Sequence, residues 1–259
     1  MITSRRNPHI AFIRSLARPS VRRRDGFTVA EGPRVVAEAL RHGAATLVLA
    51  VPDAEGAIGE LINVAHSSGV ETMACTPDVF AFAATTESPQ GILAVLRIPS
   101  PEPIQGTPLA LLIDGVQDPG NVGGLMRTAL AAGVTQVLAT IGGADPYAPR
   151  AMRAGSGAQF KLPVATRQPA AAIAGALGAD PLYAATLDGV ALYTDIDWTR
   201  PCALAVGSEG HGVSDQIHAL AAATIRIPLA GHTASLNAAA AAAVILFEAA
   251  RQRSVAPPT

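Results

Sequence analysis

The amino-acid sequence predicts an α/β protein with two domains, and three observations lead to this prediction. Hydrophobic residues make up 49% of the 259 residues, enough to build a sizeable core. Short, continuous apolar runs alternate along the chain with segments of helical periodicity, a pattern typical of a parallel sheet covered on both faces. Residues 100–108 interrupt this alternation with three prolines and a glycine, which indicates a linker.

The first domain is expected to span residues 1–99 as a small α/β unit. Apolar runs predict strands at Phe27–Ala30, Leu47–Val51, Val70–Ala74 and Ile92–Leu96. Segments of helical period between them predict helices at Pro33–Arg41, Ile58–Ser67 and Pro77–Ala83.

The second domain, residues 109–259, repeats the alternation. Strands are expected at Leu109–Ile113, Gln136–Thr140, Pro181–Ala185, Ala203–Val206 and Thr224–Ile227. Helices are expected at Val122–Ala132, Ala170–Leu177, Asp215–Ala221 and Ser235–Arg251. Ligands of such sheets bind at the carboxyl ends of the strands, so the loops that follow the strands are the places to look for a site.

Charge and cysteine content narrow the function classes. The net charge is −1, yet seven arginines precede Asp25, the first carboxylate of the chain. This basic arm is either a solvated helix or a contact for nucleic acid. Cys75 and Cys202 are far apart in apolar contexts, which gives neither a disulfide framework nor a metal-ligand spacing. We therefore expect no bound metal, and we expect the protein to reside in a reducing cytoplasm. No apolar run approaches the roughly 18 residues of a membrane span, and no secretory signal is expected.

Three loops of the second domain follow apolar strands and are rich in Gly, Asn, Ser or Glu. The first, residues 114–124, leads into the helix that carries Arg127, with Asn121 expected as its N-cap. Its spacing is neither the dinucleotide fingerprint nor a P-loop, and alone it is typical of any strand–loop–helix crossing. The second, residues 206–214, places Glu209 among three glycines. The third, residues 227–237, leads into an alanine-rich helix, where Ser235 could act only as an N-cap.

Taken together, the three loops resemble the motifs of the SpoU, or TrmH-like, family of RNA ribose methyltransferases of the SPOUT superfamily. The matching residues are Asn121 to Gly133 for the first motif, Gly207-Ser208-Glu209-Gly210-His211-Gly212 for the second, and Ile227-Pro228-Leu229 with Ser235-Leu236-Asn237 for the third. The resemblance extends to residues 145–158 and to the first domain, where Ile2-Thr3-Ser4, Asn7-Pro8, Glu31-Gly32-Pro33-Arg34 and Ser88-Pro89-Gln90-Gly91 look like that family's substrate-binding domain.

The resemblance implies a fold, a cofactor and a reaction. The second domain would contain a deep trefoil knot, which physics alone does not predict. The cofactor would be S-adenosylmethionine, and the reaction would be transfer of its methyl group to a ribose 2′-hydroxyl, most readily of ribosomal RNA because minimal transfer-RNA relatives commonly lack the extra domain. The protein would be a cytoplasmic homodimer that associates through the knotted domain and has no membrane partner.

The resemblance also assigns roles to individual residues. Arg127 would be the central catalytic residue and, because a guanidinium is a poor general base, would position the hydroxyl and a nearby phosphate. The supporting catalytic residues would be Asn121, Glu209, Ser235 and Asn237. The cofactor would contact Thr140, Gly207, Ser208, Ile227, Leu229 and Leu236. RNA would contact Arg5, Arg6, Arg22, Arg23, Arg34 and Arg153.

Several alternatives stay open at this point. The chain could be an RNA-binding or ribosome-assembly factor that keeps the knotted fold without catalysis, which loss of cofactor binding would reveal. It could be a transfer-RNA ribose methyltransferase or a base-methylating relative. A nucleotide-binding oxidoreductase or kinase-like protein is disfavoured by the missing fingerprints.

Overall fold

The computed structural model describes residues 1–52, 56–86, 88–100, 108–230 and 235–255. It divides into two compact units: residues 1–100 with 147–160, and residues 101–146 with 161–259. The expected linker at 100–108 lies almost wholly outside the described residues. None of the described helices is long and apolar enough to cross a membrane.

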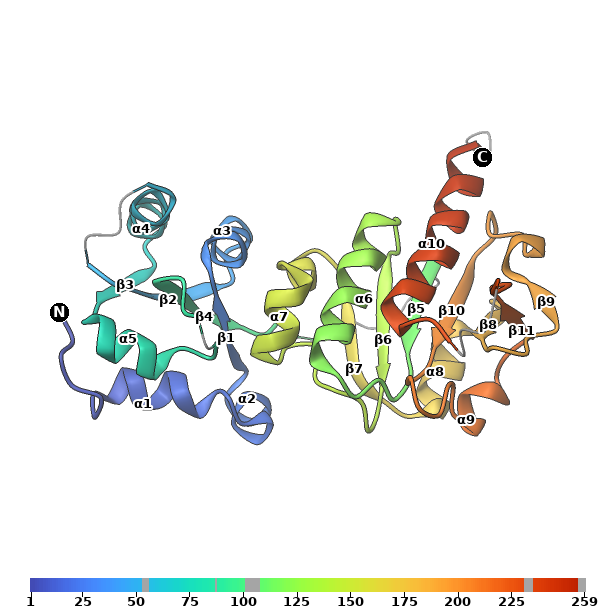
Figure 1. Ribbon diagram of the computed structural model, residues 1–259, viewed down its shortest axis with the longest axis horizontal. Coiled ribbons are helices and arrows are strands. Elements are labelled where there is room, and N and C mark those ends of the chain that lie inside the picture. Colours follow the sequence, from blue (N-terminus) through green and yellow to red (C-terminus); the bar gives the residue numbers. More distant parts are fainter. Residues whose placement is uncertain (53–55, 87, 101–107, 231–234, 256–259) are drawn as a thin grey trace. The chain divides into compact units, whose positions relative to one another are not determined.

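The first unit is built on a four-stranded mixed sheet (Figure 1). Its strands are β1 (Phe27–Glu31), β2 (Ala45–Ala50), β3 (Glu71–Ala74) and β4 (Ile92–Arg97), in the order β1-β4-β2-β3. β4 pairs antiparallel with β1 and β2, whereas β2 and β3 are parallel. Helices α3 (Pro33–Arg41), α4 (Ala57–Ser67) and α5 (Pro77–Ala83) connect them, close to where the sequence placed them.

The basic arm forms two short helices, α1 (Pro8–Ser15) and α2 (Pro19–Asp25). Each begins with a proline, whose missing N–H costs nothing in the first turn. Asn7 caps α1 by accepting a hydrogen bond from the backbone of His9. Because Ile10 and Ile13 pack into the core of this unit, the arm is part of the folded domain and is not a free tail.

One segment departs from the expected domain division. Residues 147–160, which include α7 (Pro149–Gly155), belong to the first unit although the sequence placed them in the second domain. The Thr28 hydroxyl on β1 donates a hydrogen bond to the Tyr147 carbonyl at 2.5 Å. A Cβ at Gly157 would lie 2.8 Å from that of Glu38 on α3. Local periodicity could not reveal this packing, which joins segments more than a hundred residues apart.

The second unit contains a seven-stranded sheet in which every pairing is parallel. Its strands are β5 (Leu109–Ile113), β6 (Gln136–Thr140), β7 (Val164–Gln168), β8 (Leu182–Ala185), β9 (Ala191–Leu192), β10 (Cys202–Val206) and β11 (Ala223–Arg226). They lie in the order β7-β6-β5-β10-β8-β11-β9. The predicted α/β class with a parallel sheet is thereby confirmed, although β7 and β9 were not predicted.

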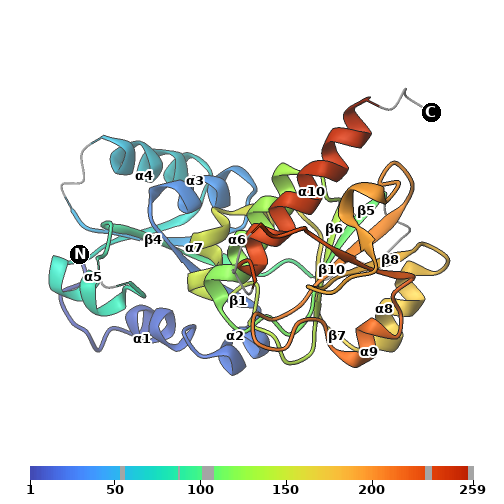
Figure 2. The same cartoon turned by 45° about the vertical axis from the view of Figure 1, so that its right-hand side comes forward.

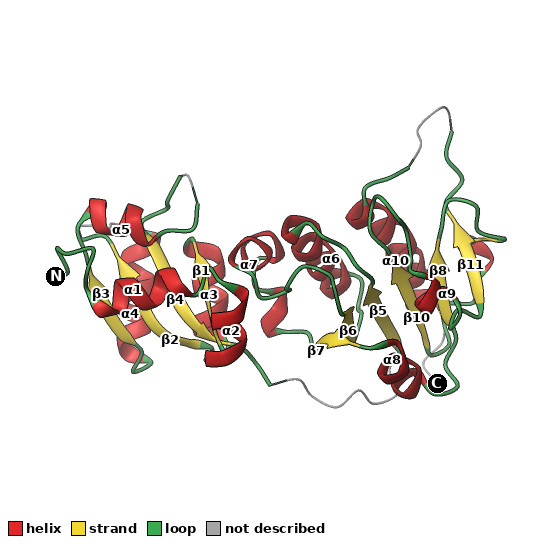
Figure 3. Ribbon diagram, turned by 90° about the horizontal axis from the view of Figure 1, so that it is seen from below, coloured by secondary structure: helices red, strands yellow, loops and turns green. Residues whose placement is uncertain are grey.

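Helices cover both faces of this sheet (Figure 3). α8 (Ala170–Leu177) and α9 (Asp215–His218) cover one face, where Ile173 and Ile217 join alternate residues of β5 and β10 in a buried cluster. α6 (Pro119–Ala131) and α10 (Ala238–Val255) lie side by side over the other (Figure 2).

The beginnings of α6 and α10 correct two predictions. Asp118, and not Asn121, caps α6, because its carboxylate accepts a hydrogen bond from the backbone of Asn121 at 2.9 Å. α10 begins at Ala238 and not at Ser235, because the side chain of Asn237 accepts from the backbone of Ala239 at 2.9 Å. Neither Asn121 nor Ser235, both predicted site residues, is therefore the cap of its helix.

Candidate cofactor and catalytic site

The three motif loops meet at one edge of the parallel sheet. The first follows β5, the second follows its neighbour β10, and the third follows β11. Because parallel strands end at the same edge, segments about a hundred residues apart in the sequence converge there.

Asp114 ties two of these loops to the sheet. It comes directly after β5 and is only 4% exposed. One carboxylate oxygen accepts a hydrogen bond from the Thr140 hydroxyl at 2.9 Å, and the other accepts from the backbone N–H of Ser214 at 2.6 Å. A single buried carboxylate therefore joins the first loop, the end of β6 and the end of the second loop.

The second loop folds into a tight hairpin that only glycine permits. Ser208 and Gly212 exchange backbone hydrogen bonds of 3.0 and 2.8 Å. A Cβ on Gly207 would lie 2.0 Å from the carbonyl carbon of Gly212, closer than any side chain allows. The hairpin places Glu209 at its tip.

Three predicted catalytic residues form one hydrogen-bonded chain. The Asn121 amide donates to a carboxylate oxygen of Glu209. The Asn237 amide donates to the Asn121 side-chain oxygen at 2.9 Å, while its own oxygen holds the first turn of α10. Each residue comes from a different motif, so this contact joins all three loops and fixes the amide orientation of Asn121.

Arg127 lies on α6, six residues after Asn121, and its side chain is exposed. Within the described parts of the chain it forms no hydrogen bond or ion pair, which leaves all its donors for a ligand. The neighbouring Gly124 lets α10 approach closely, since a Cβ there would lie 3.3 Å from that of Ala239.

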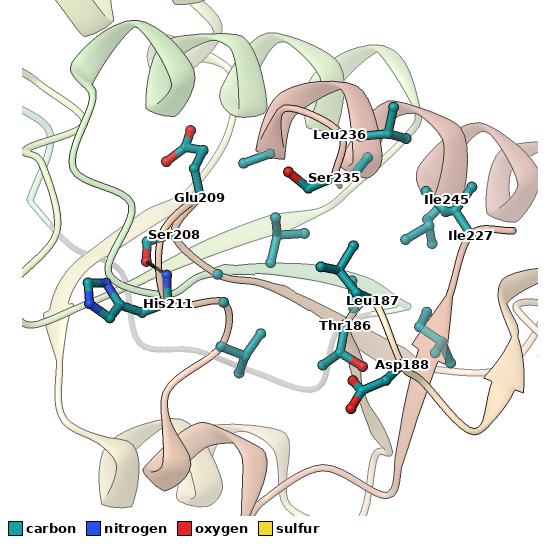
Figure 4. Close-up of a pocket in the computed structure, with 18 of the residues that line it drawn as sticks. Thr186, Leu187, Asp188, Ser208, Glu209, His211, Ile227, Ser235, Leu236 and Ile245 are labelled. Atoms are coloured by element: carbon teal, nitrogen blue, oxygen red, sulfur yellow. Dashed lines mark hydrogen bonds between the residues drawn. The ribbon is translucent and has the colours of Figure 1, made fainter. Parts of the chain in front are cut away.

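A cavity of about 430 Å³ opens beside Glu209, one end of the hydrogen-bonded Asn237–Asn121–Glu209 chain (Figure 4). Five of the six predicted cofactor contacts line it, namely Gly207, Ser208, Ile227, Leu229 and Leu236. Glu209 and Ser235 line it as well. Thr140 is not among the lining residues; its hydroxyl donates a hydrogen bond to Asp114 and accepts one from the backbone N–H of Gly115.

Several residues that line the cavity were not predicted from the sequence. Thr186, Leu187 and Asp188 come from the loop after β8, and Ile245 comes from α10. The available signal in the sequence was their position directly after a predicted strand. The structure brings them to the cavity because β8 lies between β10 and β11 in the sheet. The apolar walls and few polar groups fit a nucleoside, and the buried Thr186 hydroxyl has no partner among the described residues.

The predicted RNA contacts all lie in the first unit, and one prediction among them is wrong. The side chains of Arg5, Arg6, Arg23, Arg34 and Arg153 are exposed. Arg22 is 2% exposed, and its guanidinium donates to the carbonyls of Leu16 and Ala17 at 2.8 and 2.9 Å. It holds the end of α1 and is not accessible to phosphate.

Two arginines of the basic arm lie over one aromatic ring. Arg14 and Arg5 lie 4.0 and 5.2 Å from the centre of the Phe82 ring, measured from their guanidinium carbons. In the segments that resemble a substrate-binding domain, Gly32 and Gln90 are adjacent, since a Cβ on Gly32 would lie 2.4 Å from the Gln90 amide oxygen. The two segments therefore lie against each other.

The fold and the site together define an α/β protein with a nucleoside-sized cavity at the carboxyl ends of its parallel strands, beside the hydrogen-bonded Asn237–Asn121–Glu209 chain. Residues 108–247 match the SpoU rRNA Methylase family, and residues 7–94 match the MRM3-like substrate binding domain. The chain therefore belongs to the SpoU rRNA methylase family, which confirms the predicted family and the methyltransferase class.

Individual relatives cover almost the whole chain. The 23S rRNA (guanosine(2553)-2′-O)-methyltransferase RlmP of Bacillus subtilis is 32% identical over 95% of this chain and 97% of its own. The 23S rRNA (uridine(2479)-2′-O)-methyltransferase of Streptomyces viridochromogenes is 30% identical over 97% of this chain and 92% of its own. The crystal structure of the SpoU methyltransferase AviRb from that organism, in complex with the cofactor AdoMet, superposes with a TM-score of 0.86, at 29% identity, over 97% of this chain and 100% of its own.

Proposed function

We propose that this protein transfers a methyl group from S-adenosylmethionine to a ribose 2′-hydroxyl of ribosomal RNA. The observation that carries the proposal is the Asn237–Asn121–Glu209 chain, which joins all three motifs at the rim of a nucleoside-sized cavity. The relatives named as 23S rRNA 2′-O-methyltransferases support the reaction and favour ribosomal over transfer RNA.

When bound, S-adenosylmethionine supplies a methyl group on a sulfonium, which is already a good electrophile. The protein must therefore hold the cofactor, align the 2′-oxygen with the methyl carbon and assist loss of the hydroxyl proton. Apolar side chains from the third loop and α10, such as Ile227 and Ile245, would pack against adenine. The Gly207 hairpin would bring backbone groups close to the ligand.

Arg127 would bind the RNA at the reacting nucleotide. Its five donors suit a phosphate and the 2′-oxygen beside it, and no described protein group occupies them. Asn121 lies on the same helix and, held by Asn237 and Glu209, is a positioning residue for this part of α6. Ser235, two residues before Asn237 in the sequence, lines the cavity.

The first unit would bind the RNA around the target nucleotide. Its exposed Arg5, Arg6, Arg23 and Arg34 would neutralise phosphates, so affinity should fall steeply with salt. Arg153, on α7, would add a further phosphate contact. This part of the proposal assigns positioning to the first unit and chemistry to the second.

We also propose that the second unit is knotted. β11 is separated from β5 by two strands, yet α10, which follows β11, packs on α6, which follows β5. The third loop must therefore carry the chain back across the sheet edge. A trefoil knot at this point would bring the third motif against the first.

A homodimer in the cytoplasm would complete the proposed enzyme. On α10, Ile245 and Leu246 are buried, whereas Val244 and Phe247 are 39% and 52% exposed. Large exposed apolar side chains on the helix that packs against α6 support association of two copies there. Phe247→Asp should yield monomers in sedimentation, whereas a Phe247→Asp protein that remains dimeric would place the interface elsewhere.

The function is tested by incubating the protein with methyl-labelled S-adenosylmethionine and with unmodified ribosomal or transfer RNA. The proposal expects label in ribosomal RNA and its loss with Arg127→Ala, while Arg200→Ala, an exposed arginine outside the cavity, keeps the activity. Label in transfer RNA alone would reassign the substrate. Cofactor binding without transfer to either RNA would favour a non-catalytic RNA-binding factor.

A further inference from the structure

The loop after β8 brings two polar side chains into the cavity that no motif of the sequence indicated. β8 lies between β10 and β11, the strands that lead into the second and third motif loops. Thr186, Leu187 and Asp188 consequently line the same cavity as those loops (Figure 4).

Both polar side chains lack partners within the described chain. The Thr186 hydroxyl is buried and has no hydrogen-bond partner there, a costly arrangement unless a ligand completes it. The Asp188 carboxylate has no hydrogen bond or ion pair among the described residues. Glu209, the other carboxylate that lines the cavity, already accepts from Asn121.

Their position indicates which part of the cofactor they meet. Figure 4 shows Thr186, Leu187 and Asp188 on the side of the cavity near Ile227, with Glu209 and His211 on the opposite side. If adenine packs against Ile227 and Ile245, the ribose, which is bonded directly to adenine, lies on the same side of the cavity as Thr186 and Asp188. The reactive methyl group would then face the side of the cavity lined by Glu209, whose carboxylate accepts a hydrogen bond from Asn121.

We propose that Thr186 and Asp188 form the ribose subsite of the cofactor. The Asp188 carboxylate accepts hydrogen bonds from the vicinal 2′- and 3′-hydroxyls. The Thr186 hydroxyl, which is buried, forms a hydrogen bond with one of them after its side chain rotates towards the cavity. Acidic residues in other nucleotide-binding α/β folds bind ribose hydroxyls in this way. The inference rests on the proposed assignment of this cavity to S-adenosylmethionine.

The test compares two ligands that share the ribose and differ in the amino-acid part. S-adenosylhomocysteine carries both, whereas 5′-methylthioadenosine carries adenine and ribose only. Dissociation constants are measured by calorimetry for the full chain, for Asp188→Asn and for Thr186→Val. Asp195→Asn and Thr194→Val, exposed positions of the same unit outside the cavity, serve as matched controls.

The proposal expects Asp188→Asn to weaken both ligands by the same factor, about tenfold, and Thr186→Val to weaken both by about fivefold. The controls should bind both ligands as the unaltered protein does. A loss confined to S-adenosylhomocysteine would mean that Asp188 pairs with the cofactor's amino group and would overturn the ribose assignment. Unchanged binding of both ligands would overturn it as well. If the unaltered protein binds neither ligand, the cavity assignment itself fails, which is a distinct result.

Discussion

Asp114 provides a sharp test of how the site is assembled. Replacing it by alanine leaves the Thr140 hydroxyl and the Ser214 N–H without their acceptor, at a position that is 4% exposed. Hydrogen bonds to a charged acceptor contribute about 1.5–3 kcal/mol each, and the freed donors recover part of this from water. We therefore expect the Asp114→Ala variant to lose about 3 kcal/mol of unfolding free energy.

For a unit of this size, that loss corresponds to a melting temperature lower by about 9 °C in calorimetry. Affinity for S-adenosylhomocysteine should fall too, because the second loop loses its anchor at Ser214. Asp114→Asn can still accept from Thr140 but turns an N–H group towards the Ser214 N–H, so its loss should be intermediate. Asp195→Ala, an exposed aspartate of the same unit, should change neither quantity. An Asp114→Ala protein that melts within about 2 °C of the unaltered one and binds the ligand equally well would refute this account.

Three further predictions concern a loop, a buried arginine and a thiol. Gly207→Ala should abolish binding of S-adenosylhomocysteine in calorimetry, because its Cβ would collide with the Gly212 backbone at 2.0 Å; normal binding would contradict the hairpin geometry. Arg22→Gln should lower the melting temperature, because Arg22 is buried and holds two backbone carbonyls. Arg23→Gln should weaken RNA binding in a filter assay and leave the melting temperature unchanged, because Arg23 is exposed. The reverse pattern would contradict the assignment of Arg22 to the fold and of Arg23 to the RNA. Burial raises the pKa of Cys75 to about 11, so native protein should resist thiol reagents at pH 8. Because the folded state favours the neutral thiol, the contribution of this group to the free energy of unfolding is complete below about pH 8.5 and is lost as the pH rises towards 11. Urea titrations should show a smaller loss of stability over this pH range for Cys75→Ala than for the unaltered protein.

The regular elements were largely predictable because their signals are local. α3, α5, α8, β5 and β6 have the bounds that periodicity indicated. The start of α6 was misplaced because two potential caps, Asp118 and Asn121, stand three residues apart. The proline at 119 favours the first, since proline is best tolerated in the first turn of a helix.

The site was predictable to the extent that it lies in motif loops. The sequence could name Asn121, Glu209 and Asn237, but not the hydrogen bonds that join them across 88 and 116 residues. Thr186 and Asp188 were missed because their position at the cavity depends on strand order, which places β8 between β10 and β11. Arg22 was misassigned because charge alone does not distinguish a phosphate contact from a buried side chain that holds backbone carbonyls.

The most direct test of the central claim is where the transferred methyl group resides. Ribosomal RNA labelled by the protein is hydrolysed in alkali, which requires a free 2′-hydroxyl at each cleaved position. Methylation of the ribose predicts that the label appears in alkali-resistant dinucleotides, and that Arg127→Ala produces none. Label found in mononucleotides would mean that a base is methylated, and would contradict the assignment of the site to a ribose 2′-hydroxyl.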